Sequence, residues 1–123
     1  MYPVTHFELP VDDPDRAQTF YGDAFGWTVD SIPMGDASYL MTTTVDPSDE
    51  DVIGINGAFI DRVEPLVSPV LTIEVPSIDD IIETVEAAGG SVIVPREAAS
   101  DMGYFAYIED TEGNVIGLWQ SLS

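Results

Sequence analysis

The strongest constraint on this chain is a duplication inside it. Three landmarks of the first half recur 64 positions later: the start of a candidate strand, the cap of a candidate helix and the glycine that ends that helix. The three pairs are His6 and Val70, Asp13 and Ser77, and Gly26 and Gly90. Three landmarks in one register predict two copies of a single structural unit.

The first copy predicts the order β-α-β-β-β. Residues 5–11 alternate apolar and polar side chains, which is the period of a strand. Asp13 as N-cap and Gly26 at the end frame a short amphipathic helix. Further strands are predicted at residues 27–32, 37–44 and 52–60, the first two joined by a turn at 33–36.

The second copy predicts the same order. A strand at residues 70–75 precedes a helix that Ser77 caps and Gly89-Gly90 ends. A short β run at 91–95 and a loop at 96–101 lead to a closing hairpin, Met102–Asp110 and Val115–Gln120. Asp110 can accept from the turn backbone and Gly113 can take positive φ, which suits a type I turn followed by a bulge.

The length of 123 residues suits one compact domain built from two small repeats. We therefore expect residues 1–123 to form one domain, with repeats at about 1–62 and 68–123 and a proline-containing linker between them. No apolar run is long enough to span a membrane and no secretory signal is recognisable, so we expect a cytoplasmic protein. The chain has no cysteine, which excludes disulfides, thiolate metal sites and thiol nucleophiles.

The charge balance is extreme for a folded chain. There are 23 acidic residues against three arginines, with no lysine, and the formal net charge is −20. Because 45% of the residues are hydrophobic, the chain is not a disordered acidic tail. Self-repulsion of this size is screened at ~1 M salt, which favours a halophilic cytoplasm over an ordinary acidic protein. Nucleic acid is not expected as a partner, because phosphate contacts need Lys or Arg.

Several motifs resemble the vicinal oxygen chelate superfamily, the group of glyoxalase I, bleomycin-resistance proteins and extradiol dioxygenases. They are His6-Phe7-Glu8-Leu9-Pro10-Val11 with Asp13-Pro14, Phe20-Tyr21-Gly22-Asp23-Ala24-Phe25-Gly26-Trp27, Ala87-Ala88-Gly89-Gly90, and Asp110-Thr111-Glu112-Gly113-Asn114 followed by Val115-Ile116-Gly117-Leu118-Trp119-Gln120. The resemblance implies an α+β fold of two tandem βαβββ modules, glyoxalase-like, whose curved sheets form a cleft. It also implies a homodimer, since related folds assemble or exchange modules through exposed sheet edges.

The resemblance also implies where metal ligands would lie. Metal-dependent members place them at the start of the first strand and within the fourth strand of each module. These positions fall on His6, on Val70, on Gly117 and on or near Gly57, so one competent ligand of four remains. A catalytic divalent site normally needs three or more side-chain ligands, so no metal or other cofactor is expected. The alternative is a shifted divalent-metal site of His6 with Glu8 and Glu74.

The leading prediction is a glyoxalase- and bleomycin-resistance-like protein that binds a small apolar or aromatic molecule without the usual metal site. The candidate cleft is lined by six residues: His6, Glu8, Thr72, Glu74, Gly117 and Trp119. A divalent-metal-dependent lyase, isomerase or dioxygenase using His6 with displaced carboxylates is the alternative. A third possibility is a subunit whose cleft is filled by its own side chains. No catalytic residue is assigned. The purely structural explanation of His6 is a hydrogen-bonded histidine on a strand, and that of the glutamates is solvated acidic residues.

Glycines inside strands often mark a bulge or a close approach of another group. If Gly57 and Gly117 both face the cleft, they widen it; the alternative is a bulge needed for sheet curvature. Phe59 and Trp119 would then line an aromatic slot beside the glycines, and core packing is the alternative explanation of these two rings. The facing of Tyr39, Met41, Tyr104 and Tyr107 on the third strands is left open by the sequence.

Overall fold

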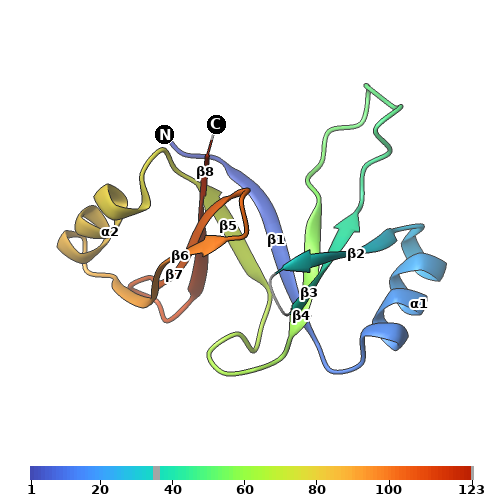
Figure 1. The fold of residues 1–123 in the computed structure, drawn as a ribbon, viewed down its shortest axis with the longest axis horizontal. Coiled ribbons are helices and arrows are strands. Elements are labelled where there is room, and N and C mark those ends of the chain that lie inside the picture. The colour runs from blue at the N-terminus through green and yellow to red at the C-terminus, as the bar shows by residue number, and fades with distance from the viewer. Residues whose placement is uncertain (35–36, 123) are drawn as a thin grey trace. The chain divides into compact units, whose positions relative to one another are not determined.

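The computed structural model describes residues 1–34 and 37–122, and it divides into two compact units. Module 1 is His6–Pro69; module 2 runs from Val70 onward and includes Met1–Thr5. The element order β-α-β-β-β occurs twice along the chain (Figure 1), which confirms the predicted α+β fold of two βαβββ modules. No helix in the described ranges is long and apolar enough to cross a membrane.

Module 1 is a four-stranded mixed sheet with one helix. Its elements are β1 (Val4–Val11), α1 (Pro14–Phe25), β2 (Thr28–Met34), β3 (Ala37–Thr43) and β4 (Gly57–Asp61). The strands lie in the order β2-β3-β4-β1, with β4 parallel to β1 and antiparallel to β3. Because β2 continues through Met34, only residues 35–36 remain of the predicted turn, and they lie outside the described residues.

The predicted ends of α1 are confirmed. The Asp13 carboxylate accepts a hydrogen bond from the Arg16 backbone N–H at 3.1 Å, and Pro14 occupies the first helical turn. Gly26 ends the helix in the left-handed conformation, with φ of 75°.

The fourth strand begins later than predicted, at Gly57 and not at residue 52. The Asn56 side chain accepts hydrogen bonds from the backbone N–H groups of Thr44 and Val45, and the Thr44 hydroxyl donates to the Ile55 carbonyl. Side chains therefore satisfy groups that a strand ladder would otherwise use, and residues 44–56 form a long loop between β3 and β4 (Figure 1).

Module 2 has the same plan. Its elements are β5 (Val70–Glu74), α2 (Ile78–Ala87), β6 (Ser91–Ala99), β7 (Gly103–Glu109) and β8 (Val115–Ser121), with the strands in the order β5-β8-β7-β6. The predicted loop at 96–101 is wrong over its first four residues, because β6 continues through Ala99. Irregular register between Val92 and Glu97 lets the strand pass Pro95 and resume pairing with β7.

The closing hairpin is confirmed. β7 and β8 pair antiparallel from Gly103 with Ser121 to Glu109 with Val115. In the turn, the Asp110 carboxylate accepts from the backbone N–H groups of Glu112 at 2.8 Å and Asn114 at 2.9 Å, and Gly113 has φ of 83°.

The repeat is not exact at the helix ends. Ser77 caps α2 as predicted, by accepting from the Asp80 backbone N–H. The glycine with positive φ after α2 is Gly89, at 103°, whereas Gly90 lacks that conformation. The positive-φ glycine thus comes one residue earlier than the 64-residue interval predicts, and α2 ends at Ala87, two residues earlier than the end of α1 at Phe25 predicts.

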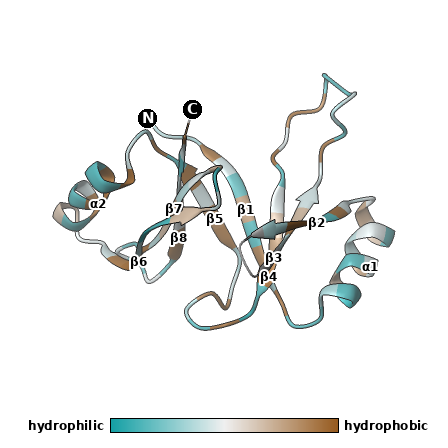
Figure 2. Ribbon diagram, viewed as in Figure 1, coloured by the Kyte–Doolittle hydropathy of each residue, from teal (hydrophilic) through white to brown (hydrophobic). Residues whose placement is uncertain are grey.

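The two helices are packed very differently. In module 2, Ile78 of α2 is fully buried against Val75, Ala106, Ile108 and Leu118, an arrangement worth about 1.5–3 kcal/mol for that side chain alone. Helix α1 has no buried residue, and Phe20 is 57% exposed. Figure 2 shows both hydrophilic and hydrophobic residues along each helix.

Candidate functional site

In module 2, the four predicted site residues share the sheet face that α2 does not cover. Thr72 lies opposite Gly117, and Glu74 lies opposite Trp119, in the parallel pairing of β5 with β8. The alternate residues Ile73 and Leu118 belong to the core under α2. Since successive side chains of a strand point to opposite faces, these four residues lie together on the other face.

Gly117 makes room for the Thr72 hydroxyl. A Cβ atom at Gly117 would lie 2.9 Å from Thr72 Oγ1 and 3.5 Å from Val70 Cγ1. Thr72 is only 7% exposed. The glycine therefore permits a close approach of a polar group from the neighbouring strand, as expected for glycine inside a strand.

The structure adds two aromatic residues that the sequence left unassigned. Phe105 lies opposite Trp119, and Tyr107 lies opposite Gly117, in the pairing of β7 with β8. Their rings contact each other edge to face, with centroids 6.0 Å apart. This face of module 2 is therefore aromatic as well as polar. Tyr104 points the other way, toward the α2 core, and Arg96 lies over its ring at 4.7 Å.

In module 1, the predicted residues His6 and Glu8 are joined by a third side chain, Tyr39 of β3. The Tyr39 hydroxyl donates to Glu8 Oε2 at 2.7 Å, and His6 Nε2 lies 3.0 Å from the same hydroxyl oxygen. Glu8 is only 6% exposed. Met41, also on β3, lies opposite Ala58 of β4. The predicted pair is thus part of a hydrogen-bonded chain, His6–Tyr39–Glu8, on one face of the module 1 sheet.

The direction of this chain assigns the proton on His6. Because the Tyr39 proton is donated to Glu8, the Tyr39 oxygen is the acceptor for His6 Nε2–H. In the neutral ring this leaves Nδ1 as an acceptor, and the structure gives Nδ1 no partner among the residues it describes. His6 can therefore accept a hydrogen bond from the N–H or O–H group of a ligand.

Burial keeps this histidine neutral. Loss of solvation lowers the pKa of His6 below its ordinary value of 6.5, and the nearby Glu8 carboxylate raises that pKa by a smaller amount. Desolvation is the larger influence, so the imidazole is an uncharged acceptor at neutral pH.

Gly57 does not face this site, contrary to one interpretation of the sequence. A Cβ atom at Gly57 would lie 2.5 Å from the Phe7 carbonyl oxygen and 2.6 Å from two Phe7 ring carbons. Phe7 packs on Trp27, whose ring stacks on Tyr21 of α1 at 4.8 Å, so this is the helix side of the sheet. The glycine accommodates the Phe7 backbone and ring and does not widen a cleft.

The aromatic slot proposed for Phe59 is also wrong. Phe59 is 2% exposed, and its ring lies 5.5 Å from the ring of Tyr21 on α1. Phe59 is therefore a core residue of module 1. Strand pairing places Ala58 opposite Glu8 and Gly117 opposite Thr72, so Ala58, and not Gly57, is the counterpart of Gly117.

Comparisons with known proteins agree with this architecture. A family model described as bleomycin resistance protein-like N-terminal matches residues 4–44. The mycobacterial protein CFP32, whose name assigns it provisionally to the glyoxylases, is 28% identical over 125 residues in both Mycobacterium tuberculosis and Mycobacterium bovis, covering 93% of this chain and 44% of the relative.

Solved structures share the fold at low identity. The methylmalonyl-CoA epimerase of Mycobacterium tuberculosis superposes with a TM-score of 0.69 at 15% identity, covering 98% of this chain and 88% of the epimerase. A Streptomyces coelicolor methylmalonyl-CoA epimerase variant in complex with 2-nitronate-propionyl-CoA gives a TM-score of 0.70 at 14% identity, covering 98% and 97%. The chain is thus similar in sequence to bleomycin-resistance-like and glyoxylase-named proteins, and it shares the fold of the epimerases. It spans less than half the length of its curated mycobacterial relatives.

Most of the superfamily's metal-ligand positions carry a side chain that cannot coordinate a metal ion. Of these positions, His6 has a coordinating side chain, whereas Val70 is a buried valine and the fourth-strand positions are Ala58 and Gly117. Among the described residues, no group of three or more His, Asp or Glu side chains is arranged to hold a metal ion. The residues at these positions do not fit the usual three-ligand centre.

The predicted site residues thus fall into two groups. His6 and Glu8 meet through Tyr39 in module 1, and Thr72, Glu74, Gly117 and Trp119 share one face of module 2. A cleft that joins all six stays a prediction.

Proposed function

We propose that this chain is a member of the vicinal oxygen chelate superfamily that binds a small apolar or aromatic molecule carrying a hydrogen-bond donor, without the superfamily's usual metal site. The observation that carries the proposal is the His6–Tyr39–Glu8 chain. The chain of hydrogen bonds presents a neutral imidazole acceptor on a partly buried face of the sheet. Small-molecule sites typically use a small number of such polar protein groups to orient the ligand.

The face of module 2 supports the same proposal. Thr72 and Glu74 supply polar groups, while Trp119, Phe105 and Tyr107 supply aromatic surface. Aromatic rings with a few fixed polar groups favour a planar ligand. Solved structures of the same fold hold coenzyme A derivatives, which agrees with a small-molecule role and does not name the ligand.

Ligand-dependent stabilisation tests the proposal. A ligand that binds only the folded state, at 100 times its Kd, adds about 2.7 kcal/mol, which for a chain of this length raises Tm by about 10 °C. The screen uses phenols, anilides and aryl amides at about 1 M KCl, where the Debye length is about 3 Å. A library of this kind that leaves Tm unchanged throughout overturns the proposal.

The single histidine then locates the bound molecule. Because His6 is the sole histidine of the chain, its ring gives one set of NMR resonances. A ligand that donates to Nδ1 shifts this set, and its affinity falls in Tyr39→Phe, which removes the hydroxyl that orients the ring. Tyr2→Phe, at an exposed tyrosine of module 2, is the control and should leave affinity unchanged.

A divalent-metal-dependent lyase, isomerase or dioxygenase remains the competing function. It is favoured by one observation, namely that two ligand-type side chains, His6 and Glu8, meet at one phenol. Metal content of protein purified without chelators or affinity metals separates the two. About one equivalent of transition metal per chain, lost in His6→Ala, supports the metal enzyme, whereas the binding proposal predicts that His6→Ala changes only ligand affinity.

The setting that we propose is a homodimer in a salt-rich cytoplasm. The net charge of −20 with no lysine supports the salt adaptation. Sedimentation at about 1 M KCl tests the dimer, and a monomer at all protein concentrations contradicts it.

A further inference from the structure

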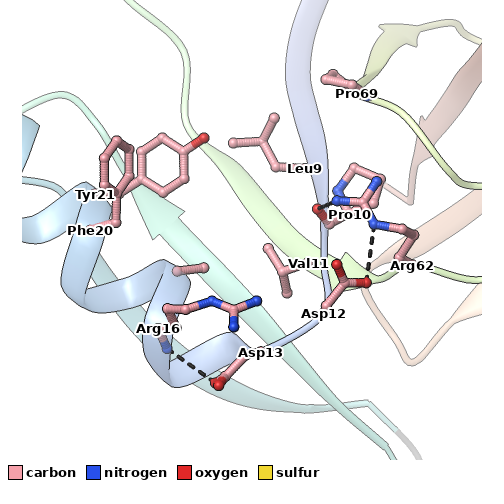
Figure 3. Close-up of a pocket in the computed structure, with 11 residues that line it drawn as sticks. Leu9, Pro10, Val11, Asp12, Asp13, Arg16, Phe20, Tyr21, Arg62 and Pro69 are labelled. Atoms are coloured by element: carbon pink, nitrogen blue, oxygen red, sulfur yellow. Dashed lines mark hydrogen bonds and ion pairs between the residues drawn. The ribbon is translucent and has the colours of Figure 1, made fainter.

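A pocket lies within module 1, on the side of the sheet toward α1. It is an open hollow with a volume of about 460 Å³, within the range of small-molecule sites. Its apolar lining comes from β1, α1 and the end of the module (Figure 3): Leu9, Pro10, Val11, Ala17, Phe20, Tyr21 and Pro69. Helix α1, which contributes Arg16, Ala17, Phe20 and Tyr21 to the pocket, has no buried residue.

Charge is concentrated at this pocket in an unusual way. Two of the three basic residues in the whole chain, Arg16 and Arg62, line it together with Asp12 and Asp13. In a protein with a net charge of −20, two arginines at one small cavity are not explained by composition.

Three of these four charged groups are already engaged. Arg62 donates from Nε to the Asp12 carboxylate at 3.1 Å, from Nη1 to the Val67 carbonyl at 2.6 Å and from Nη2 to the Pro10 carbonyl at 3.1 Å. The Asp13 carboxylate caps α1. These bonds fix the wall of the pocket, and the ion pair with Arg62 offsets the charge of Asp12.

Arg16 is the exception. Its guanidinium makes no hydrogen bond or ion pair with the residues that the structure describes, and Figure 3 draws an interaction only from its backbone nitrogen. A guanidinium presents a planar set of donors that matches a carboxylate. The unpaired Arg16 guanidinium therefore lies beside a partly apolar cavity that is large enough for an aryl or alkyl group.

We infer that this pocket binds a small carboxylate with an apolar body, the carboxylate on the Arg16 guanidinium and the body against Leu9, Val11 and Phe20. This site is separate from the His6–Tyr39–Glu8 chain and does not depend on the function proposed there. High salt assists it, because screening removes the long-range repulsion between the acidic protein and an anionic ligand.

Phenylacetate and its neutral analogue phenylacetamide test the inference. Both are titrated into the folded protein at about 1 M KCl, and backbone amide shifts are followed by NMR. The expected result is that phenylacetate shifts the amides of Leu9, Val11 and Ala17 and binds about tenfold or more tightly than the amide, since hydrogen bonds to charged groups are the strong ones.

Two variants and a control assign the effect. Arg16→Gln, at an exposed residue, should remove the preference for the acid, while Arg96→Gln, which changes the one arginine outside the pocket, should keep it. Phe20→Ala should weaken both probes alike, because it removes apolar surface and no charge.

Three results would overturn the inference. The first is no saturable shift up to roughly 50 mM, well above the millimolar range expected for so small a ligand. The second is a preference for the acid that survives Arg16→Gln. The third is a set of shifted amides that clusters around Arg96 in module 2.

Discussion

Alanine at Gly57 should destabilise the protein much more than alanine at Gly117, although both glycines lie in fourth strands. At Gly57 the new Cβ would meet the Phe7 carbonyl oxygen at 2.5 Å and the Phe7 ring at 2.6 Å. That carbonyl belongs to the backbone of β1, which is paired with β4, so it cannot move without disturbing the sheet. At Gly117 the close contact is Thr72 Oγ1, the end of a side chain that can rotate.

The size of the effect follows from these contacts. Overpacking a core costs about 1–3 kcal/mol of stability, and because the clash at Gly57 is with backbone, we expect the cost of Gly57→Ala at the upper end of that range. Replacing glycine returns about 0.4–1 kcal/mol by restricting the unfolded chain. The net loss for Gly57→Ala is about 2 kcal/mol, or about 8 °C in Tm for a chain of this length. Gly117→Ala should stay within about 1 kcal/mol of the parent protein.

Thermal unfolding followed by circular dichroism at about 1 M KCl measures both variants under conditions that suppress charge repulsion. Equal Tm values for the two variants, or a Gly57→Ala protein as stable as its parent, would refute the assignment of Gly57 to the Phe7 contact. The same result would reopen the interpretation in which Gly57 widens a ligand cleft.

Four further predictions concern protons and salt. Glu8→Gln should lower the pKa of His6, because the Glu8 carboxylate is the influence that raises it; a ring-resonance titration that shows no change or a rise contradicts this. Burial holds the His6 pKa below 6.5, so the unfolded chain binds the proton more readily than the folded chain does. The contribution of neutral His6 to the free energy of unfolding should be fully present above about pH 6.5 and should decrease as the pH falls toward the folded-state pKa. His6→Gln should flatten this pH dependence, as measured by urea unfolding at several pH values. Hydrogen bonds from Asn114, chiefly from its backbone N–H and then from its side chain, lower the pKa of Asp110. The Asp110 carboxylate therefore stabilises the turn above its ordinary pKa of 3.8 and loses this effect as the pH falls below that value toward the folded-state pKa. Asp110→Ala should speed amide exchange at Asn114 at neutral pH. Tm should rise steeply between about 0.1 and 1 M KCl, and a flat response would contradict salt adaptation.

The sequence by itself determined the features that arise within a few residues of chain. Asp13, Ser77 and Asp110 bind backbone N–H groups close to them in sequence, and Gly26 and Gly113 supply positive φ where a helix or a turn ends. These interactions need no tertiary contact, so they could be predicted along with the order of elements and the duplication. His6 and Glu8 could be paired as neighbours on one strand face by the two-residue period.

The tertiary structure decided everything that depends on register between strands. A shift of one residue turns a strand's side chains to the opposite face, so the sequence could not tell whether Gly57 or Ala58 lies opposite Glu8, nor which way Tyr39 and Tyr107 point. The partner of the His6–Glu8 pair therefore became visible only with the pairing in place.

The weak cover of α1 was equally hidden. Both helices show an amphipathic pattern, yet α2 buries Ile78 completely and α1 buries no residue. Packing depends on how well side chains from distant segments fit together, which periodicity does not record. The sequence thus determined the two modules and their turns. The tertiary structure decided that Tyr39 joins His6 to Glu8 and that the Arg16 guanidinium, unpaired among the described residues, lies beside a cavity. Both arrangements depend on residues brought together from separate elements.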